Sequence, residues 1–179
     1  MTNHNIVIAG FGGQGVLFTG KVIAYAGLID GNEVSWLPSY GPEMRGGTAN
    51  CSICISDKPI GSPLVTQPDA LVVMNSPSYD KFIESVLPGG VVVADSSMMQ
   101  DACPLPPQEV KLFEIPATQL SNDEHLEGLA NIILLGKTLK ETGFSSVETV
   151  EKALEKSVPA SKKHLLEPNM RAIKLGMSL

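Results

Sequence analysis

Short apolar runs rich in valine and isoleucine alternate along the chain with longer stretches in which apolar residues recur at helical spacing. Four of the runs occupy residues 5–9, 69–74, 90–95 and 110–115. The runs at 69–74 and 90–95 are continuously apolar, which is typical of parallel strands that are covered on both faces. We therefore expect these four runs to form strands of one mainly parallel sheet.

Helical patterns separate and follow these strands, at residues 16–28, 78–87, 123–141, 146–157 and 168–175. This alternation predicts an α/β fold, and we expect a single Rossmann-like, doubly wound domain over residues 1–179 with helices on both faces of the sheet. The apolar side chains of the 123–141 helix surround most of its circumference, too wide a stripe for one contact with a sheet. That helix is therefore either buried on two sides within the fold or part of a subunit interface.

The third and fourth helical patterns begin with Ser-x-x-Glu, which is the spacing of a capping box. Ser121 and Glu124 are placed to cap the third helix, and Ser145 and Glu148 the fourth. Gly143 follows the third helix and is placed to end it, because glycine readily adopts the left-handed conformation that closes helices.

The region between the first helix and the 69–74 strand predicts a β-hairpin that projects from the sheet. A strand at 33–37 leads into a polar, glycine-rich loop, and residues 50–56 alternate as a second strand. The turn Ser56-Asp57-Lys58-Pro59 then leads to Ile60, which places the hairpin around this turn.

Glycines are concentrated directly after the first strand, in Gly10-Phe11-Gly12-Gly13-Gln14-Gly15, which we call the glycine turn. It matches G-x-G-x-x-G between a strand and a helix, the context in which this pattern binds phosphate groups. Gly10 would allow the tight turn, Gly12 would let backbone approach a ligand, and Gly15 would let the helix pack on the strand. The free N–H groups of the first helical turn would face an anion. The candidate cofactor-binding residues are Gly10, Gly12, Gly13, Gln14 and Gly15; alternatively, these glycines only permit close packing.

Two common nucleotide-binding signatures are incomplete. An NAD site needs an acidic residue at the end of the second strand, about 20 residues further on, but Asp30 and Glu33 precede or begin that strand. A dinucleotide oxidoreductase is therefore disfavoured. The overlapping stretch from Gly15 to Lys21 has the spacing of a P-loop, yet Val22 stands where a hydroxyl would bind Mg²⁺. We therefore do not expect an ATPase.

Charge and composition narrow the classes of partner. The chain has 13 basic and 19 acidic side chains, a net charge of −6, and no dense basic cluster. Nucleic acid and anionic membranes are therefore disfavoured as partners. No basic leader precedes a long apolar stretch, and no apolar run reaches the roughly 18 residues that span a bilayer. We expect a cytoplasmic protein without membrane insertion.

The three cysteines, Cys51, Cys54 and Cys103, are an odd number, which argues against a disulfide framework and favours a reduced compartment. Cys51 and Cys54 lie three positions apart in a predicted strand, where side chains at this spacing point to opposite faces. No second C-x-x-C pair exists. We expect both to be packing residues rather than zinc ligands or redox groups.

No catalytic or metal-binding constellation is evident. None of His4, His125 and His164 lies beside a candidate nucleophile, and the hydrolase and metal motifs are absent. Asp95 and the two serines after it follow a strand, where they either cap the next segment, which we favour, or contribute to a site. We therefore predict no catalytic and no metal-ligating residue in this chain, which most naturally works as part of something larger.

Three segments together carry a resemblance to a known family. They are the glycine turn with its flanks (residues 8–16), the stretch Ser39-Tyr40-Gly41-Pro42-Glu43-Met44-Arg45-Gly46-Gly47, and the turn at residues 56–60 with the following Ser62-Pro63. In this order they resemble the gamma subunit of the 2-oxoacid:ferredoxin (acceptor) oxidoreductases. The resemblance runs from about residue 5 to residue 95 and continues more loosely through 131–136.

The resemblance implies a multisubunit enzyme that oxidatively decarboxylates a 2-oxoacid, transfers the acyl group to coenzyme A and passes electrons to ferredoxin or a related acceptor. Thiamine diphosphate, Mg²⁺ and iron–sulfur clusters would then be held by the alpha, beta and delta sister subunits, or by fused equivalents, because this chain lacks their motifs. The isolated chain would be inactive and would contribute interface and coenzyme A contacts. The substrate that we favour is 2-oxoglutarate; pyruvate, branched-chain 2-oxoacids and indolepyruvate stay open.

The resemblance also implies that one loop faces the partner close to the active site, with Arg45 available to an anionic group. Its residues are Ser39, Tyr40, Gly41, Pro42, Glu43, Arg45, Gly46 and Gly47. Two other interpretations remain open: a free-standing nucleotide-binding enzyme of Rossmann type that uses the glycine turn, and a ligand-sensing or purely structural module.

Overall fold

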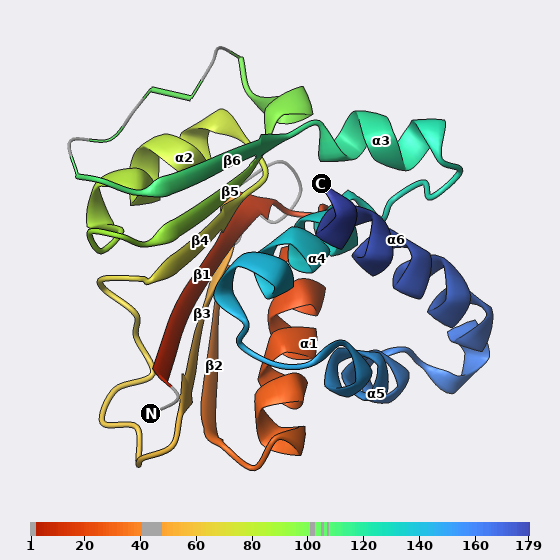
Figure 1. Ribbon diagram of the computed structural model, residues 1–179, viewed down its shortest axis with the longest axis horizontal. Helices are drawn as coiled ribbons and strands as arrows, with labels where there is room; N and C mark the ends of the chain where they lie inside the picture. Colours follow the sequence, from red (N-terminus) through yellow and green to blue (C-terminus); the bar gives the residue numbers. More distant parts are fainter. Residues whose placement is uncertain (1–2, 41–47, 101–102, 105, 107) are drawn as a thin grey trace.

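A six-stranded sheet in the order β2-β3-β1-β4-β5-β6 forms the centre of the molecule (Figure 1). The computed structural model describes residues 3–40, 48–100, 103, 104, 106 and 108–179. The strands are β1 (Asn3–Phe11), β2 (Glu33–Tyr40), β3 (Thr48–Ser56), β4 (Ala70–Val73), β5 (Val91–Asp95) and β6 (Lys111–Ile115). Strands β1, β4, β5 and β6 are mutually parallel, whereas β3 runs antiparallel to both of its neighbours.

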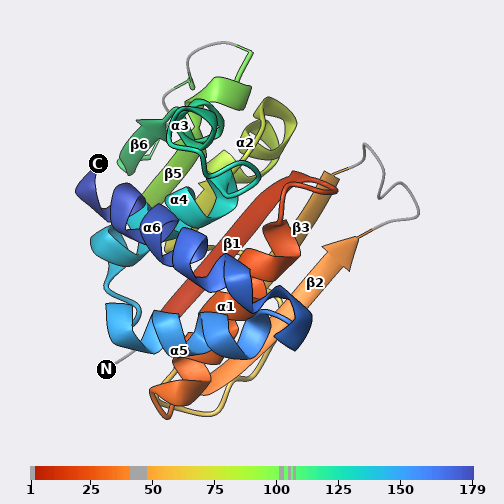
Figure 2. The same ribbon diagram turned by 90° about the vertical axis from the view of Figure 1, so that its right-hand side faces the viewer.

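Helices cover both faces of the sheet, as expected for a doubly wound fold. One face carries α1 (Val16–Ile29), α4 (Ala130–Thr142), α5 (Val147–Ser157) and α6 (Leu166–Ser178), which lie together in front of the sheet in Figure 2. The other face carries α2 (Ser76–Phe82), which ends in a 3-10 turn, Ile83–Ser85. The short helix α3 (Ala117–Asp123) contacts α4.

Alternate side chains of the central strands fill two separate cores. Ile6 and Ile8 of β1 belong to the core under α1 and α4, and Val7 and Ala9 belong to the core under α2. All four are almost fully buried. Because a strand of this kind is covered on both faces, it reads as a continuous apolar run, which explains why β1, β4 and β5 could be predicted.

The apolar helix α4 is buried within the chain itself. Every residue from Ala130 to Leu139 is buried, because α4 lies between the sheet and α6 and also contacts α1. Gly136 and Gly176 face one another's helix: a Cβ on Gly136 would overlap the carbonyl of Ile173, and one on Gly176 that of Ile133. The wide apolar stripe is thus explained by packing on two sides, so it supplies no evidence for a subunit interface.

The predicted boundaries of that helix were wrong. Ser121 lies inside α3, where its hydroxyl donates to the carbonyl of Thr118 at 2.9 Å, so it does not cap α4. His125 and Gly128 both have positive φ (54° and 79°), which separates α3 from α4. Gly143 ends α4 in the left-handed conformation, as predicted.

The second predicted capping box was displaced by one residue. The Ser146 side chain, not that of Ser145, accepts from the N–H of Thr149 at the start of α5. The Ser145 hydroxyl instead donates to the Asp30 carboxylate at 2.5 Å, which ties the end of α1 to α5.

The antiparallel hairpin exists, but it is formed by β2 and β3 rather than around the turn at residues 56–60. Residues 57–69 form no strand. They pass over one face of the sheet. There the carbonyl of Ser62 accepts a hydrogen bond from the Cys54 thiol at 3.8 Å. The reason is register: β3 already pairs with β2 on one side and with β1 on the other, so no free edge remains for a further strand.

Candidate ligand and subunit-contact site

The strand ends that flank the second glycine-rich segment lie beside the glycine turn, at one end of the sheet. Gly10 of β1 pairs with Ala49 of β3, which in turn pairs with Tyr40 of β2, so these three residues form one row across the sheet. Tyr40 and Thr48, the described residues on either side of positions 41–47, therefore lie beside the glycine turn. Its residues Gly41, Pro42, Glu43, Arg45, Gly46 and Gly47, which we predicted to face a partner, lie outside the described residues; Ser39 and Tyr40 are in β2.

This end of the sheet is also its topological switch point. The parallel strands β1 and β4 are neighbours, and the helices that follow them, α1 and α2, cover opposite faces. In doubly wound folds ligands bind in the crevice that this arrangement opens at the carboxyl ends of the strands. The glycine turn and residues 74–78 lie at these strand ends.

The backbone of the glycine turn leaves the start of α1 open. Gly13 and Gly15 have φ values of 97° and 78°, which glycine adopts at little cost. Among the described residues no side chain caps α1, and no acidic residue occupies its first turn. No described residue accepts a hydrogen bond from the N–H of Val16 or Leu17. The arrangement can therefore hold an anionic group through backbone N–H groups and the helix dipole.

Gln14 joins the glycine turn to the end of β4. Its carboxamide oxygen accepts from the N–H of Phe11 at 2.6 Å, and its nitrogen donates to the carbonyl of Met74 at 3.1 Å. Asn75, whose oxygen caps α2 through the N–H of Ser78, contacts the Gln14 oxygen at 3.5 Å. Gln14 thus fastens the glycine turn of β1 to the end of β4.

Asn131, which sequence reasoning missed, supports the turn from α4. Its side-chain nitrogen donates to the carbonyl of Gly15 at 3.3 Å and to the hydroxyl of Thr19 at 3.0 Å. A Cβ on Gly15 would overlap this side chain. The signal that could have found it is an asparagine at the start of an otherwise apolar helical stretch.

The strand order differs from the one that forms an NAD site. In the dinucleotide fold the second strand pairs directly with the first, and its end supplies the acidic residue. Here β3 lies between β1 and β2, and Asp30 bonds to the hydroxyls of Ser145 and Thr149. Lys21 lies inside α1, so the stretch before it is helix rather than a phosphate-binding loop.

The other candidate residues, Asp95, Cys51 and Cys54, have structural roles. The Asp95 carboxylate accepts from the N–H of Ser97 at 3.1 Å and from the hydroxyl of Thr118 at 2.6 Å, which confirms the favoured capping role. Cys51 and Cys54 are buried on opposite faces of β3, as predicted: Cys51 donates to the carbonyl of Val16, on the α1 side. Burial raises the pKa of the Cys51 thiol to about 12, so it is unreactive at neutral pH.

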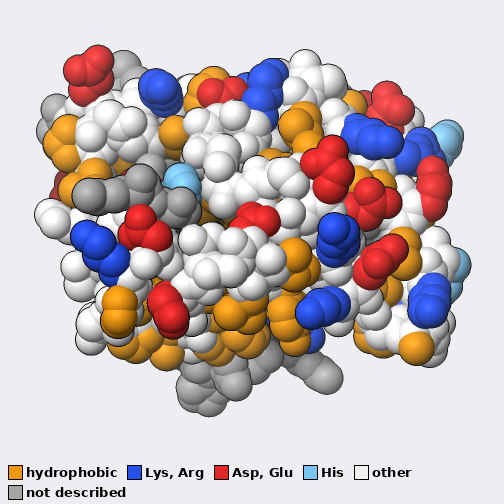
Figure 3. All heavy atoms as spheres, turned by 60° about the horizontal axis from the view of Figure 1, so that its bottom comes forward, with side chains coloured by type: hydrophobic (Ala, Val, Ile, Leu, Met, Phe, Trp, Pro, Cys, Tyr) orange, Lys and Arg blue, Asp and Glu red, His pale blue; other side chains and the backbone are white. Residues whose placement is uncertain are grey.

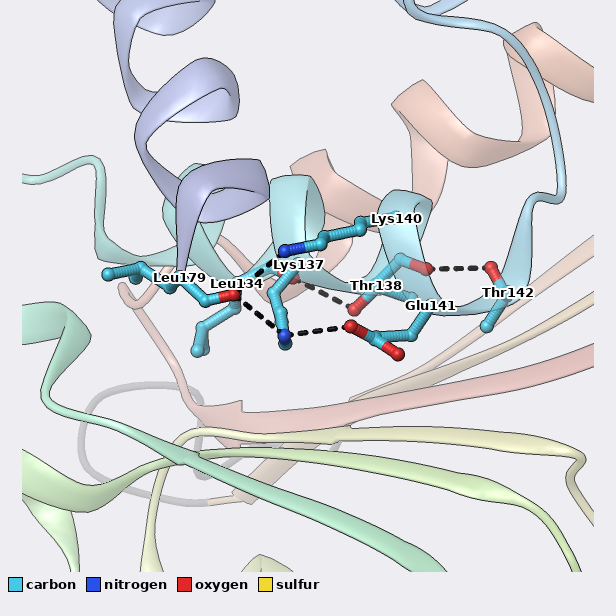
Figure 4. Close-up of polar contacts among 7 residues, drawn as sticks. All are labelled: Leu134, Lys137, Thr138, Lys140, Glu141, Thr142 and Leu179. Carbon is cyan, nitrogen blue, oxygen red and sulfur yellow. Dashed lines mark hydrogen bonds and ion pairs between the residues drawn. The ribbon is translucent and has the colours of Figure 1, made fainter.

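The one buried lysine of the described chain is held by neighbours within the fold (Figure 4). The Lys137 ammonium forms an ion pair with Glu141 at 2.7 Å, donates to the carbonyl oxygen of Leu179 at 2.9 Å and lies 4.2 Å from the centre of the Phe113 ring. Lys140 donates to the same oxygen at 3.0 Å. These contacts fasten the end of α6 to α4, so Lys137 has a structural partner for its charge.

Charged side chains of both signs are mixed on the surface, and metal-ligating side chains do not cluster among the described residues. Acidic and basic side chains are interspersed on the face shown in Figure 3. Among the described residues no group of three or more His, Cys, Asp or Glu side chains could hold a metal ion. Within the same ranges, every helix is too short or too polar to cross a membrane.

Comparisons with known proteins identify the family. A family model described as pyruvate ferredoxin/flavodoxin oxidoreductase matches residues 5–179. The 2-oxoglutarate synthase subunit KorC of Methanocaldococcus jannaschii is 38% identical over 173 residues, covering 96% of this chain and 90% of that protein. The ketoisovalerate oxidoreductase subunit VorA of Methanothermobacter thermautotrophicus is 37% identical, again over 96% of this chain, but the chain spans only 35% of VorA.

A solved structure agrees with these relatives. The gamma subunit of a keto/oxoacid ferredoxin oxidoreductase from Geobacter sulfurreducens superposes with a TM-score of 0.84 at 33% identity, covering 99% of this chain and 96% of that one. The resemblance predicted from the glycine turn and the later motifs is thereby confirmed. This chain belongs to the pyruvate ferredoxin/flavodoxin oxidoreductase family and is a gamma-subunit-type chain of the 2-oxoacid:ferredoxin oxidoreductases.

Proposed function

We propose that this chain is the gamma subunit of a complex that converts a 2-oxoacid and coenzyme A to an acyl-coenzyme A, CO₂, a proton and two electrons, which pass to ferredoxin or a similar acceptor. Thiamine diphosphate with Mg²⁺ and the iron–sulfur clusters do not fit the described residues, which contain no cluster of metal-ligating side chains. We assign them to alpha, beta and delta sister subunits or their fused equivalents. The role of this chain is then to bind and position, in the cytoplasm.

One observation carries this proposal: the glycine turn lies beside Tyr40 and Thr48, the residues that flank segment 41–47, at the switch point of the sheet. Both motifs are thereby available to a single ligand or to a single partner surface. A free-standing nucleotide-binding enzyme is less well supported, because β3 occupies the position that the second strand of a dinucleotide fold would take.

We assign the open start of α1 to an anionic group of coenzyme A. The uncapped N–H groups and the absence of an acidic side chain in the first turn fit a phosphate. Gly12 and Gly13 would allow the close approach. Gly10 and Gly15 are packed against side chains of the fold and would hold the shape of the turn together with Gln14. Bound coenzyme A supplies the thiol that accepts the acyl group; this chain supplies no reacting atom.

We further propose that the segment from Ser39 to Gly47 faces the sister subunit that holds the reacting centre. Arg45 would then be available to a carboxylate or phosphate there, since a guanidinium binds such groups through two parallel hydrogen bonds. In support, Tyr40 at the end of β2 and Thr48 at the start of β3 lie at the same edge of the sheet as the glycine turn.

As substrate we propose 2-oxoglutarate. Support comes from length together with identity: the KorC relatives match over 90%, 93% and 95% of their own chains at 38%, 36% and 34% identity. The VorA relatives match over only 35% and 27% of theirs, and the separate gamma subunits named for pyruvate and ketoisovalerate match over 82% but at only 28% identity. A chain of this length therefore corresponds to the separate subunit that bears the 2-oxoglutarate synthase name in those organisms.

The test of the turn uses two variants of one position. Gly13 has free space around it, and asparagine and aspartate tolerate positive φ better than other residues. Gly13→Asp would place a carboxylate at the start of α1, whereas Gly13→Asn is its uncharged match. In the complex reconstituted with sister subunits we expect Gly13→Asp to raise the KM for coenzyme A at least tenfold over Gly13→Asn, with little change in kcat. Equal KM values for the two variants would contradict the assignment.

A further inference from the structure

The sheet has a free edge at β2, where no described segment pairs with the outer side of the strand (Figure 2). β2 is eight residues long and pairs only with β3 within the described ranges. Apart from that pairing, no hydrogen bond between described residues involves a backbone group of residues 33–40. An edge of this kind presents unpaired N–H and C=O groups, which can pair with a strand of another chain.

The direction of these backbone groups follows from the pairing of β1. The N–H and the C=O of Asn5 both bond to Asp69, next to β4, so Asn5 points away from β3. Residues of an antiparallel pair alternate between bonding to the neighbour and pointing away from it, so the next residue, Ile6, bonds to Ile53 of β3. Ile53 then points away from β2, and its partner there, Trp36, directs its N–H and C=O outward.

The same alternation applies two positions to either side of Trp36. Val34 also directs both backbone groups outward, whereas Pro38 directs only its carbonyl outward, because proline has no N–H. Edge strands tolerate proline where its nitrogen faces away from the sheet, so Pro38 agrees with this assignment. The part of the edge that offers both donors and acceptors is therefore at Val34 and Trp36.

A groove of about 240 Å³ lies between this edge and α1, and we call it the α1–β2 groove. Its lining consists of Val34 and Trp36 from β2, together with Lys21, Ala24, Tyr25 and Leu28, which share one face of α1. Leu28 and Trp36 are 53% and 37% exposed, so large apolar side chains face solvent here. A strand added at the edge would place every second side chain over this groove.

Lys21 is the one charged residue among those that line the α1–β2 groove. It is half-buried, its ammonium lies 5.6 Å from the centre of the Tyr25 ring, and it forms no ion pair with any described residue. Of the acids nearest in sequence, Glu33 lies on the face of the sheet opposite to Val34, and Asp30 bonds to two hydroxyls at the start of α5. The groove therefore favours a segment that brings apolar side chains and a carboxylate.

We propose that an extended segment of a sister subunit pairs with the free edge of β2 as a further strand, with apolar side chains over the α1–β2 groove and a carboxylate beside Lys21. In such strand additions the main-chain hydrogen bonds give affinity and the pockets for alternate side chains give specificity. A second copy of this chain fits less well, because Val34, Trp36 and Pro38, the side chains that its β2 would place there, supply no acid for Lys21. The inference rests on the proposed role of this chain as a subunit.

The experiment is amide hydrogen exchange, read at single residues, in the isolated full chain and in the assembled complex. We expect the N–H groups of Val34 and Trp36 to exchange at least about tenfold more slowly in the complex. The N–H groups of Ser35 and Leu37 point to β3 and should be protected in both samples.

Unchanged exchange at Val34 and Trp36 on assembly would overturn the strand addition and leave the proposed function standing. Failure to assemble at all would contradict the proposed function instead. Protection of these two N–H groups that appears in the isolated chain as its concentration rises would indicate a second copy and overturn the choice of partner.

Charge reversal supplies the second readout. Lys21→Glu should weaken assembly at least about fivefold, because the carboxylate of the added strand would then meet a like charge. Lys111→Glu makes the same change of charge on β6, at the opposite edge of the sheet, and should leave assembly within about twofold. Neither lysine forms an ion pair with a described residue, so neither substitution removes one. Equal effects of the two substitutions would overturn the proposal.

Discussion

The side-chain nitrogen of Asn131 donates a hydrogen bond to the carbonyl of Gly15 at 3.3 Å, across 116 positions of sequence. The bond joins the start of α4 to the start of α1, where Gly15 holds a φ of 78°. Because the Asn131 side chain fills the space that a Cβ on Gly15 would need, the conformation of the turn and the packing of α4 depend on each other.

Gly15→Ala should therefore destabilise the chain more than Gly13→Ala. Both positions have positive φ, which costs a residue with a Cβ about 1–2 kcal/mol, but only at Gly15 would the Cβ meet another side chain. We expect Gly15→Ala to lower the free energy of unfolding by about 1–3 kcal/mol more than Gly13→Ala, as measured by urea denaturation.

Removing the Asn131 side chain should restore part of the stability that Gly15→Ala loses. In the double variant Gly15→Ala with Asn131→Ala the Cβ has space, so the combined loss should be smaller than the sum of the two single losses. Strictly additive losses would show that Asn131 does not restrict Gly15.

Gln14→Glu should loosen the attachment of the glycine turn to the end of β4. Glutamate can still accept from the N–H of Phe11, but it places a carboxylate oxygen against the carbonyl of Met74, where Gln14 donates. We expect a loss of about 1–3 kcal/mol, together with faster amide hydrogen exchange in the glycine turn. Gln119→Glu, at an exposed position of α3, is the control and should be near neutral; a similar loss for both would argue against the bridging role of Gln14.

Gly176→Ala should separate α6 from α4. The Cβ would overlap the carbonyl of Ile133, which is backbone and cannot turn away. We expect a loss of at least about 2 kcal/mol, in the range of an overpacked core, seen as a lower Tm. Gly61→Ala has open space and should change the Tm by less than about 2 °C. A Tm for Gly176→Ala within that limit would mean that the two helices are not in close contact.

Stability should fall at alkaline pH, partly through Cys51. Burial raises the pKa of this thiol from 9.0 to about 12 in the folded chain. The unfolded chain therefore loses the proton first, so the stabilisation present below pH 9 is lost as the pH rises from about 9 towards 12. Each pH unit in this window should cost up to about 1.4 kcal/mol from this group.

The measurement is urea denaturation at pH 9.5 and 10.5 for the wild type and for Cys51→Ala, which lacks the group. The free energy of unfolding should fall less steeply with pH in the variant. Parallel pH dependences would show that the thiol does not titrate between folded and unfolded states in the expected way.

Local patterns predicted the first strand, the glycine turn and α1 to within a few residues, because each depends on neighbours in sequence. The position of β3 could not be predicted in this way. It depends on pairing between residues far apart, such as Ile6 with Ile53, and the antiparallel neighbour changes the meaning of the G-x-G-x-x-G motif.

The candidate site likewise combines features that local sequence predicts with features that depend on long-range packing. Gly10 to Gly15 could be found from spacing, whereas the supporting role of Asn131 appears only when α4 packs on α1. The wide apolar stripe of α4 allowed two interpretations, burial within the fold or a subunit interface. The contact of α4 with α6 shows that the stripe is buried within the fold. Pairing and packing over long sequence separations thus account for most of what sequence patterns missed.

The central claim, that this chain is a working subunit of a 2-oxoacid oxidoreductase, is tested most directly by anaerobic affinity purification of the tagged chain from its own host. The eluate is assayed for dye reduction that requires both a 2-oxoacid and coenzyme A. We predict larger co-purifying chains and activity that depends on both compounds, with 2-oxoglutarate the preferred acid. A chain that purifies alone and without such activity, from cells that express the sister subunits, would contradict the account.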